Sequence, residues 1–444
     1  MRSGHLLVLS FLGAILAGSL LLMLPFSTVD GELPFIDALF TATSAICVTG
    51  LTVVDTGSRF TGFGKTVILL LIQAGGLGIM TFTVLMFLSF GRLPSLRDRW
   101  LVESMYSYDS QMKIWSLVRA IFIFTFLTEL VGAVILAIGW HACGYDAVKA
   151  SWYGLFHSVS AFCNAGFALF PNSLESFRSS RLITITVALL IVLGGIGFAV
   201  VYELYKYAAG QEKPRITLHT RIVILTSLIL VLSGTLLFAL IEKNNAFSGL
   251  SLTDRVIHGF FQSVTARTAG FNTVSIATFS NASLLVFLMF MFVGASPGSC
   301  GGGVKTTSFF VLIALLVNRI RGSRHVNVRG RTVPDTIIRR VVSMVVLGIF
   351  VLFVSTLLLL LTQSVEYLLP RQRDIFISYL FESFSALGTV GLSLGVTASL
   401  DSLGKTVVIL LMFVGRVGLV TFAYGLFQRE GKQHIEYAGE EVMI

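Results

Sequence analysis

The sequence predicts an all-α integral membrane protein of four fused M1-P-M2 repeats (span, pore helix, span), with pseudo-fourfold symmetry around one central pore. Three observations lead to this fold class. Of the 444 residues, 55% are hydrophobic and 12% are charged, which is about half the charged fraction of soluble domains. Eight segments are long and apolar enough to cross a membrane, and a glycine-containing motif occurs four times between them. A soluble enzyme and a secreted disulfide scaffold are therefore excluded.

The eight predicted transmembrane helices each offer the roughly 20 apolar residues that a membrane crossing needs. They cover residues 6–24, 66–90, 120–140, 183–201, 222–241, 284–317, 341–362 and 406–427. The sixth is longer than a straight span requires, and the sequence GASPGSCGGG at 294–303 predicts a break in it. The first is longer than the apolar core of a signal peptide and no cleavage motif follows it, so we expect it to stay in the protein.

Basic residues predict the orientation of the chain. The net charge is +9, and 15 of the 32 Lys and Arg residues lie in three connections, at 92–113, 206–221 and 319–340. By the positive-inside rule these connections face the cytoplasm, as do both termini, and the protein is expected in the cell membrane. The same side chains are expected to meet water and anionic lipid headgroups, and no nucleic-acid binding is expected.

Four short apolar segments, too short to cross the membrane, share one motif and indicate internal duplication. They read FTATSAICVTGL at 40–51, FHSVSAFCNAGF at 156–167, FQSVTARTAGF at 261–271 and FESFSALGTVGL at 381–392. We assign the repeats to residues 1–90, 91–206, 207–320 and 321–444. The third repeat contains the broken span, with an intramembrane loop at about 294–305. The fourth ends in a cytoplasmic C-terminal tail, of which 433–444 is a candidate docking segment.

The spacing of the motif suits a cation filter. A helix that enters half the membrane and returns as extended chain leaves carbonyl groups without helical partners, which is tolerated only in protein or beside water. Four such loops around one axis would form rings of carbonyls that replace the hydration shell of a cation. The short helices would point their negative C-terminal ends at the same place. Glycine suits each turn because it adopts backbone angles that other residues avoid.

These segments resemble the four filter segments of the Trk/Ktr/HKT superfamily of potassium transporters, and the resemblance covers nearly the whole chain. In that family, glycine at each filter position accompanies potassium selectivity, whereas serine in the first repeat accompanies sodium permeability. The resemblance therefore implies potassium uptake, with K+ bound by the filter's backbone carbonyls. The residues concerned are Cys47, Val48, Thr49, Gly50, Cys163, Asn164, Ala165, Gly166, Thr268, Ala269, Gly270, Gly388, Thr389, Val390 and Gly391.

The compact length resembles the membrane subunits of Ktr-type systems in particular. That resemblance implies a homodimer with one pore per subunit, resting on a cytosolic ring of nucleotide-binding regulatory subunits of the KtrA type. No cofactor is expected, because the histidines and cysteines show no metal-ligand spacing. Coupling to or activation by Na+ is implied by some relatives and by no residue of this chain. A P-loop-like stretch that ends at Lys305 lacks the required spacing and a preceding strand.

A second set of glycines, Gly75, Gly194, Gly294 and Gly415, follows the motifs. Close helix packing explains the first two copies best, but the third and fourth copies depart from the pattern. We therefore expect the gate there, formed by a flexible loop that obstructs the pore together with a charge in the eighth span, where a charge is costly. The predicted gate residues are Gly294, Ala295, Ser296, Pro297, Gly298, Ser299, Cys300, Gly301, Gly302, Gly303, Lys305 and Arg416.

Several alternatives remain open at this point. Arg416 is expected to contact loop carbonyls in the closed state, but a structural ion pair between helices would also explain it. Arg267 is expected to bond behind the third filter segment, with Glu382 as a partner. A symporter working by alternating access is the main rival function. An intramembrane enzyme is the other rival, and the sequence offers no catalytic constellation for it.

Overall fold

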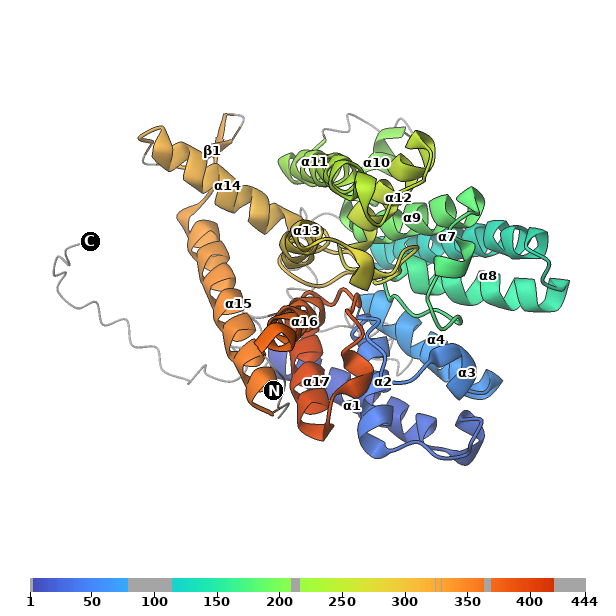
Figure 1. Ribbon diagram of the computed structural model, residues 1–444. Coiled ribbons are helices and arrows are strands. Elements are labelled where there is room, and N and C mark those ends of the chain that lie inside the picture. The colour runs from blue at the N-terminus through green and yellow to red at the C-terminus, as the bar shows by residue number, and fades with distance from the viewer. Residues whose placement is uncertain are drawn as a thin grey trace.

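The computed structural model describes residues 3–78, 114–208, 216–323, 325–328, 330–362 and 369–418. These residues are predominantly helical (Figure 1). The longer helices are α1 (Ser3–Leu22), α2 (Phe35–Ile46), α4 (Gly62–Gly76), α7 (Ile114–Ala142), α8 (Ala147–Phe162), α9 (Arg181–Gly195), α10 (Phe198–Ala208), α11 (Leu218–Ile241), α12 (Leu252–Thr265), α13 (Asn281–Phe292), α14 (Thr306–Ile320), α15 (Asp335–Thr362), α16 (Leu369–Gly388) and α17 (Ser402–Val417).

The remaining elements are short. They comprise helix α3 (Thr56–Arg59), the 3-10 turns η1 (Pro25–Ser27), η2 (Glu175–Phe177), η3 (Glu242–Asn244), η4 (Ile276–Thr278) and η5 (Thr397–Ser399), and the strands β1 (Asn327–Val328) and β2 (Arg331–Thr332). The two strands pair in antiparallel register. Many helices begin where a side chain accepts the hydrogen bond of a free backbone N–H, as Asp146 does for Lys149 and Asp401 does for Gly404. Such caps explain why the helices start at these residues.

Three described helices are long and apolar enough to cross a membrane: Val118–Ala142 within α7, Leu218–Asn244 over α11 and η3, and the whole of α15. A fourth crossing is possible if α9 and α10 together form one bent span. Shorter apolar helices occur in α1, α2, α4, α13, α14 and α16. Residues 79–90 of the second predicted span and 419–427 of the eighth lie outside the described residues, as do the first basic connection and the C-terminal tail.

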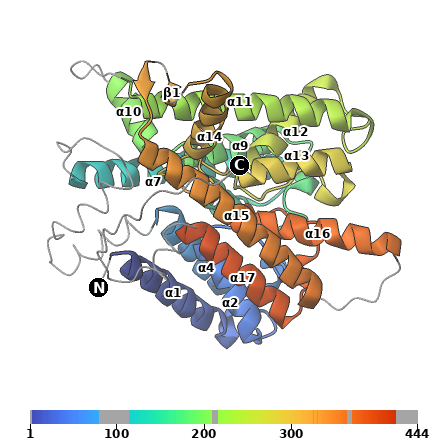
Figure 2. The same ribbon diagram turned by 90° about the vertical axis from the view of Figure 1, so that its left-hand side faces the viewer.

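The helices form four groups around a common centre (Figure 1), and Figure 2 shows α17 beside α2. Within the groups, α1 packs on α2, α7 on α8, α11 on α12 and α15 on α16. Between the groups, α4 packs on α8, α9 on α12, α13 on α16 and α17 on α2. The last pairing joins the last described helix to the second helix of the chain, so the four groups close a ring.

A largely buried ion pair lies at this closing contact. Lys405 Nζ, near the start of α17, lies 2.6 Å from Asp37 Oδ1 in the first turn of α2. Their side chains are only 15% and 13% exposed. The ring is therefore closed by charge as well as by apolar packing of α17 against α2.

The fourth predicted span differs from its expected form. A continuous helix over 183–201 was expected, but α9 ends at Gly195 and α10 begins at Phe198, with a bend of 95° between them. The physical reason lies in the intervening residues, because Gly197 adopts φ +97° and an α-helix cannot continue through such a residue. The sixth predicted span is interrupted as its glycines indicated, since α13 ends at Phe292 and α14 begins at Thr306.

Candidate functional site

Four glycines from the four sequence motifs meet at the centre of the ring. A Cβ at Gly50 would lie 2.5 Å from the carbonyl oxygen of Ala165, one at Gly166 would lie 2.8 Å from that of Ala269, and one at Gly270 would lie 2.6 Å from that of Val390. The series closes at Gly391, where a Cβ would strike the carbonyl oxygen of Thr49. Each glycine thus packs against the carbonyl that precedes the glycine of the next segment. No side chain fits at any of the four positions.

The backbone of the four segments has the same unusual conformation. Two residues before each glycine stands a non-glycine residue with positive φ, namely Val48 (56°), Asn164 (59°), Thr268 (75°) and Thr389 (50°). The glycines themselves have φ of +93°, +72°, +76° and +90° in chain order. Such angles are outliers for the three β-branched residues among them, whereas Asn adopts them more readily. The same conformation in all four segments, strained in three, marks a functional site. It lets the chain place its carbonyls where a regular strand or helix could not.

A hydroxyl from each short helix braces the segment that follows. Ser44 Oγ donates to the Leu51 carbonyl at 2.7 Å and accepts from the Gly50 N–H at 3.1 Å. The equivalent hydroxyls of Ser160 and Thr265 donate to the carbonyls just after their glycines, and that of Ser385 accepts from the Gly391 N–H. These four residues were absent from the sequence-based site. A hydroxyl at one place in all four motifs was the signal that could have found them.

The short helices end at or within three residues of the predicted filter residues. Helices α2, α8 and α16 end at Ile46, Phe162 and Gly388, and α12 ends at Thr265. The partial negative charge of a helix C-terminus therefore falls on the ring from four sides. The thiols of Cys47 and Cys163 are fully buried, which leaves backbone carbonyls as the groups that the segments can present.

Two cavities lie on either side of the ring and share no lining residue. One, called the vestibule here, has a volume of about 460 Å³ and is lined by all four ring glycines and by the carboxylates of Asp55 and Glu175. The other, called the loop cavity, has a volume of about 530 Å³ and is lined by Lys305, Arg340 and Arg416 and by no Asp or Glu of the described residues. The two sides of the ring therefore differ in electrostatic character, acidic on one side and basic on the other.

The position of Glu175 in the vestibule shifts the pKa of its carboxyl group. Burial raises the pKa of this carboxyl above its usual value of 4.5, while the hydrogen bond from Asn272 opposes that shift. Asn272 Nδ2 donates to Glu175 Oε1 at 2.6 Å. The bond also joins the third segment to the connection that follows the second.

The loop between α13 and α14, where the intramembrane loop is predicted, is docked against the bend between α9 and α10. The Ser296 N–H donates to the Gly195 carbonyl at 3.1 Å, and the Cys300 N–H donates to the Gly194 carbonyl at 3.2 Å. In return, the Phe198 N–H donates to the Gly298 carbonyl at 3.0 Å. The bend frees these backbone groups from helical bonding, and the loop satisfies them. The loop therefore docks at the break in the fourth predicted span, which the sequence did not reveal.

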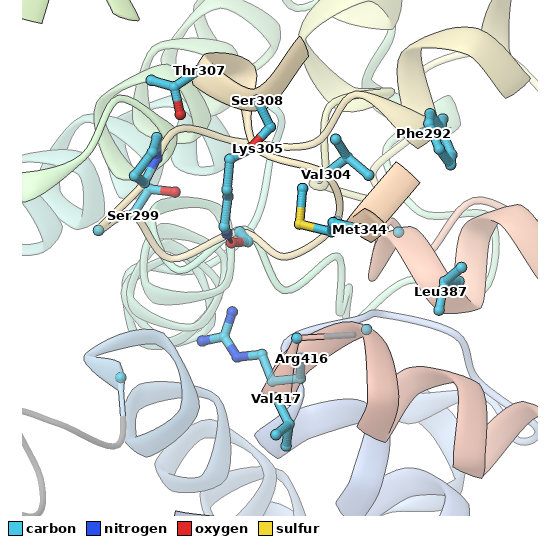
Figure 3. A pocket seen from close by; sticks show the side chains of 18 of the residues that line it. Phe292, Ser299, Val304, Lys305, Thr307, Ser308, Met344, Leu387, Arg416 and Val417 are labelled. Carbon is cyan, nitrogen blue, oxygen red and sulfur yellow. Dashed lines mark hydrogen bonds between the residues drawn. The ribbon is translucent and has the colours of Figure 1, made fainter. Parts of the chain in front are cut away.

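Two cations hold the loop from the side of the loop cavity. Lys305 Nζ donates to the Gly301 carbonyl at 2.6 Å, and the Arg416 guanidinium donates to the carbonyls of Cys300 and Gly75. Figure 3 shows the two side chains reaching into one cavity from opposite walls, Lys305 from the loop and Arg416 from α17. Among the described residues neither cation forms an ion pair, so the alternative of an ion pair for Arg416 finds no partner there.

The comparison with known proteins decides the family. A sequence model described as "TrkH: Cation transport protein" matches residues 10–427. The chain belongs to the TrkH family.

Relatives of this TrkH-family chain extend over its whole length. It is 36% identical to the Ktr system potassium uptake protein B of Bacillus subtilis, over 99% of this chain and 96% of that one. It is 39% identical to the protein of the same name from Vibrio alginolyticus, over 96% and 91%. The crystal structure of the potassium transporter TrkH from Vibrio parahaemolyticus is similar in fold, with a TM-score of 0.72 and 22% identity over 96% of this chain and 85% of that one. These relatives are transporters and not enzymes.

The second set of glycines in this TrkH-family chain serves close packing in three copies. A Cβ at Gly75, Gly194 or Gly415 would strike the carbonyl oxygen of Ile46, Phe162 or Leu387, each near the end of a short helix. Gly294 departs from the pattern and packs against Gly302 of its own loop. The third copy therefore builds the loop, whereas the others bring a helix close to the ring.

Other predicted residues of the family member lie behind the ring, with one correction. Arg267 bonds to Ser227 on α11, through the Oγ at 3.2 Å, and not to Glu382. Glu382 instead accepts hydrogen bonds from Ser393, at 2.8 Å, and from Thr397 in its own segment. Helix α11 passes behind the third segment and offers the nearer oxygen, an arrangement that sequence spacing does not reveal. The amide of Asn164 lies 3.3 Å from Thr268 Oγ1, where it links the second and third segments.

Proposed function

We propose that this chain carries K+ into the cell across the cell membrane by channel-like conduction through the ring of four segments. The observation that carries the proposal is the closed series in which each glycine packs against the carbonyl preceding the next glycine. A ring of carbonyls can replace the hydration shell of K+, and selectivity then depends on carbonyl number, field and spacing. The relatives named as potassium uptake proteins support the same ion.

The proposed architecture is four M1-P-M2 repeats with eight spans, both termini in the cytoplasm and residues 1–90, 91–206, 207–320 and 321–444 as the repeats. The ring of helix groups supports it. In this orientation the vestibule opens to the outside and its carboxylates attract cations. The loop cavity then opens to the cytoplasm. The membrane potential contributes roughly 2.3 kcal/mol per charge per 100 mV to inward movement.

The proposed gate is the loop at 294–305 together with Lys305 and Arg416. The loop lies on the cytoplasmic side of the ring in this orientation, and its two cations would repel an entering K+ in a region of low dielectric. The docked loop is therefore the closed state. Opening requires the bonds from Arg416 to the Cys300 carbonyl and from the loop to α9 to break.

The proposed assembly is a homodimer with one pore in each subunit, resting on a cytosolic nucleotide-binding regulatory ring of the KtrA type. The names of the Ktr-system relatives support a multi-component system. Such a partner would supply the free energy that releases the loop. Na+ would act as a coupling or activating ion, which ion replacement can test directly.

Ion flux in liposomes that contain the purified chain tests the function. We expect K+ and Rb+ to pass much faster than Na+ and Li+, with flux that follows an imposed membrane potential and needs no Na+ gradient. Na+ flux equal to K+ flux would contradict the filter proposal. Strict one-to-one dependence on a co-transported ion would favour the alternating-access symporter instead.

A further inference from the structure

The tip of the intramembrane loop touches the ring itself. The Gly302 N–H donates to the side-chain Oγ1 of Thr389 at 3.1 Å, and both groups are buried. An added Cβ at Gly302 would strike the same Thr389 hydroxyl, and one at Gly301 would strike the hydroxyl of Thr268. The glycines at 301 and 302 are therefore required by the two threonines. The loop contacts the third and fourth segments through side chains and not only through its place in the pathway.

The two threonines are also the strained residues of their segments. Thr389 has φ 50° and Thr268 has φ 75°, and each stands two residues before a ring glycine. A β-branched residue in this region is strained. Contacts that favour the strained conformation therefore bear directly on the geometry of the ring. The Gly302 bond is such a contact, because it fixes the Thr389 hydroxyl.

We propose that the Thr389 hydroxyl couples the loop to the ion filter, so that the closed loop and a K+-occupied filter stabilise each other. The inference rests on the proposed function, since it assigns a positioning role to one side chain of that filter. K+ that stabilises the strained backbone of the fourth segment also holds the Thr389 hydroxyl in place to accept the hydrogen bond from the Gly302 N–H. By linkage, a loop bound to Thr389 favours the ion-binding geometry to the same degree.

The first segment indicates a suitable substitution for Thr389. Val48 occupies the equivalent place in the first segment with φ 56°, so valine is compatible with this backbone. Thr389→Val then removes the acceptor and little else, whereas Thr389→Ser keeps the hydroxyl. Gly302→Ala disturbs the same contact from the loop side, because the added methyl group would strike Thr389.

Three native cysteines together allow release of the loop to be measured in the full-length chain. Cys300, in the loop, is 1% exposed and Cys47, at the first segment, is fully buried, whereas Cys143 is exposed. Alkylation by a small water-soluble maleimide, quantified for each cysteine by mass spectrometry, measures the release of the loop at Cys300. Cys143 calibrates the reagent, and Cys47 detects general loosening of the ring.

In the wild-type chain we expect Cys300 to react more slowly in K+ than in choline at equal ionic strength. Thr389→Val should raise the Cys300 rate about two- to tenfold, the factor for one neutral hydrogen bond, and should abolish the difference between K+ and choline. Thr389→Ser should restore both properties. Gly302→Ala should expose Cys300 like Thr389→Val, and Cys47 should stay protected in every variant.

Three results would overturn the coupling. The first is a wild-type Cys300 rate that is the same in K+ and in choline. The second is a Cys300 rate that Thr389→Val leaves unchanged. The third is a parallel rise in the rate at Cys47, which would show general loosening and not release of the loop. Liposome flux separates these failures from failure of the proposed function. K+-selective flux together with a Cys300 alkylation rate that does not respond to K+ would contradict only the coupling. Absence of K+-selective flux would contradict the filter proposal itself.

Discussion

Lys405 on α17 and Asp37 on α2 form an ion pair, with 2.6 Å between Nζ and Oδ1, that joins the last helix group of the ring to the first. Both side chains are largely buried. A charge left without its partner in such a place is costly, because it has lost its water and gained nothing in return. This pair closes the ring at the only junction that the chain does not itself connect.

Removing one partner of this pair should destabilise the ring more than removing both. We expect Lys405→Met alone to lower the free energy of unfolding by about 2–4 kcal/mol, measured by thermal denaturation in detergent. The double variant Lys405→Met with Asp37→Asn should recover at least half of that loss. Equal losses in the single and double variants would show that the pair contributes packing and not charge. Lys149→Met, in an exposed pair with Asp146, serves as the matched control and should cost less than about 1 kcal/mol.

Gly50 should be replaceable only at the expense of selectivity. It has φ +93°, and an added Cβ would lie 2.5 Å from the Ala165 carbonyl oxygen, so Gly50→Ser must displace that carbonyl. We expect the ratio of K+ to Na+ flux in liposomes to fall at least about tenfold, since about 1.4 kcal/mol suffices for that factor. Gly13→Ser on α1, where an added Cβ has open space, should leave the ratio unchanged. An unaltered ratio in Gly50→Ser would argue against the ring as the filter.

Arg416 should keep the closed loop in place. Arg416→Ser removes the bonds to the Cys300 and Gly75 carbonyls, each worth about 1.5–3 kcal/mol for a charged donor. We expect a basal K+ leak at least about tenfold above wild type in liposomes without any regulatory partner. Arg319→Ser, at the exposed end of α14, provides the control for loss of one positive charge. A leak equal to that of wild type would remove Arg416 from the gate.

Glu175 should make uptake sensitive to acid on the vestibule side. Burial raises the pKa of this carboxyl above 4.5, so as the pH falls its negative charge is lost at a higher pH than that of an ordinary Glu. We expect uptake at low K+ concentration to fall by about twofold as the charge that attracts cations is lost. Glu175→Gln should show the low rate at all pH values and a flatter pH profile. Glu32→Gln, on an exposed loop, should keep the wild-type profile.

The sequence predicted the parts of the site that depend on local pattern. The four motif glycines, the interrupted sixth span and the contact of Arg416 with loop carbonyls all appear at the expected positions. It did not reveal the bend at Gly197 or the partner of Arg267. Both depend on contacts with segments about 40 to 100 residues away, as the loop bonds to Gly194 and the Arg267 bond to Ser227 show.

The sequence by itself determined that this chain is a membrane protein and at which positions its four repeated turns occur. Apolar length and repeated glycines are linear properties, and they can be read without knowing any contact. Only the tertiary structure decided which carbonyl faces which glycine, where the loop is seated and that Gly302 bonds to Thr389. These facts arise when the ring closes, because closure brings together backbone groups whose hydrogen-bonding needs a sequence leaves open.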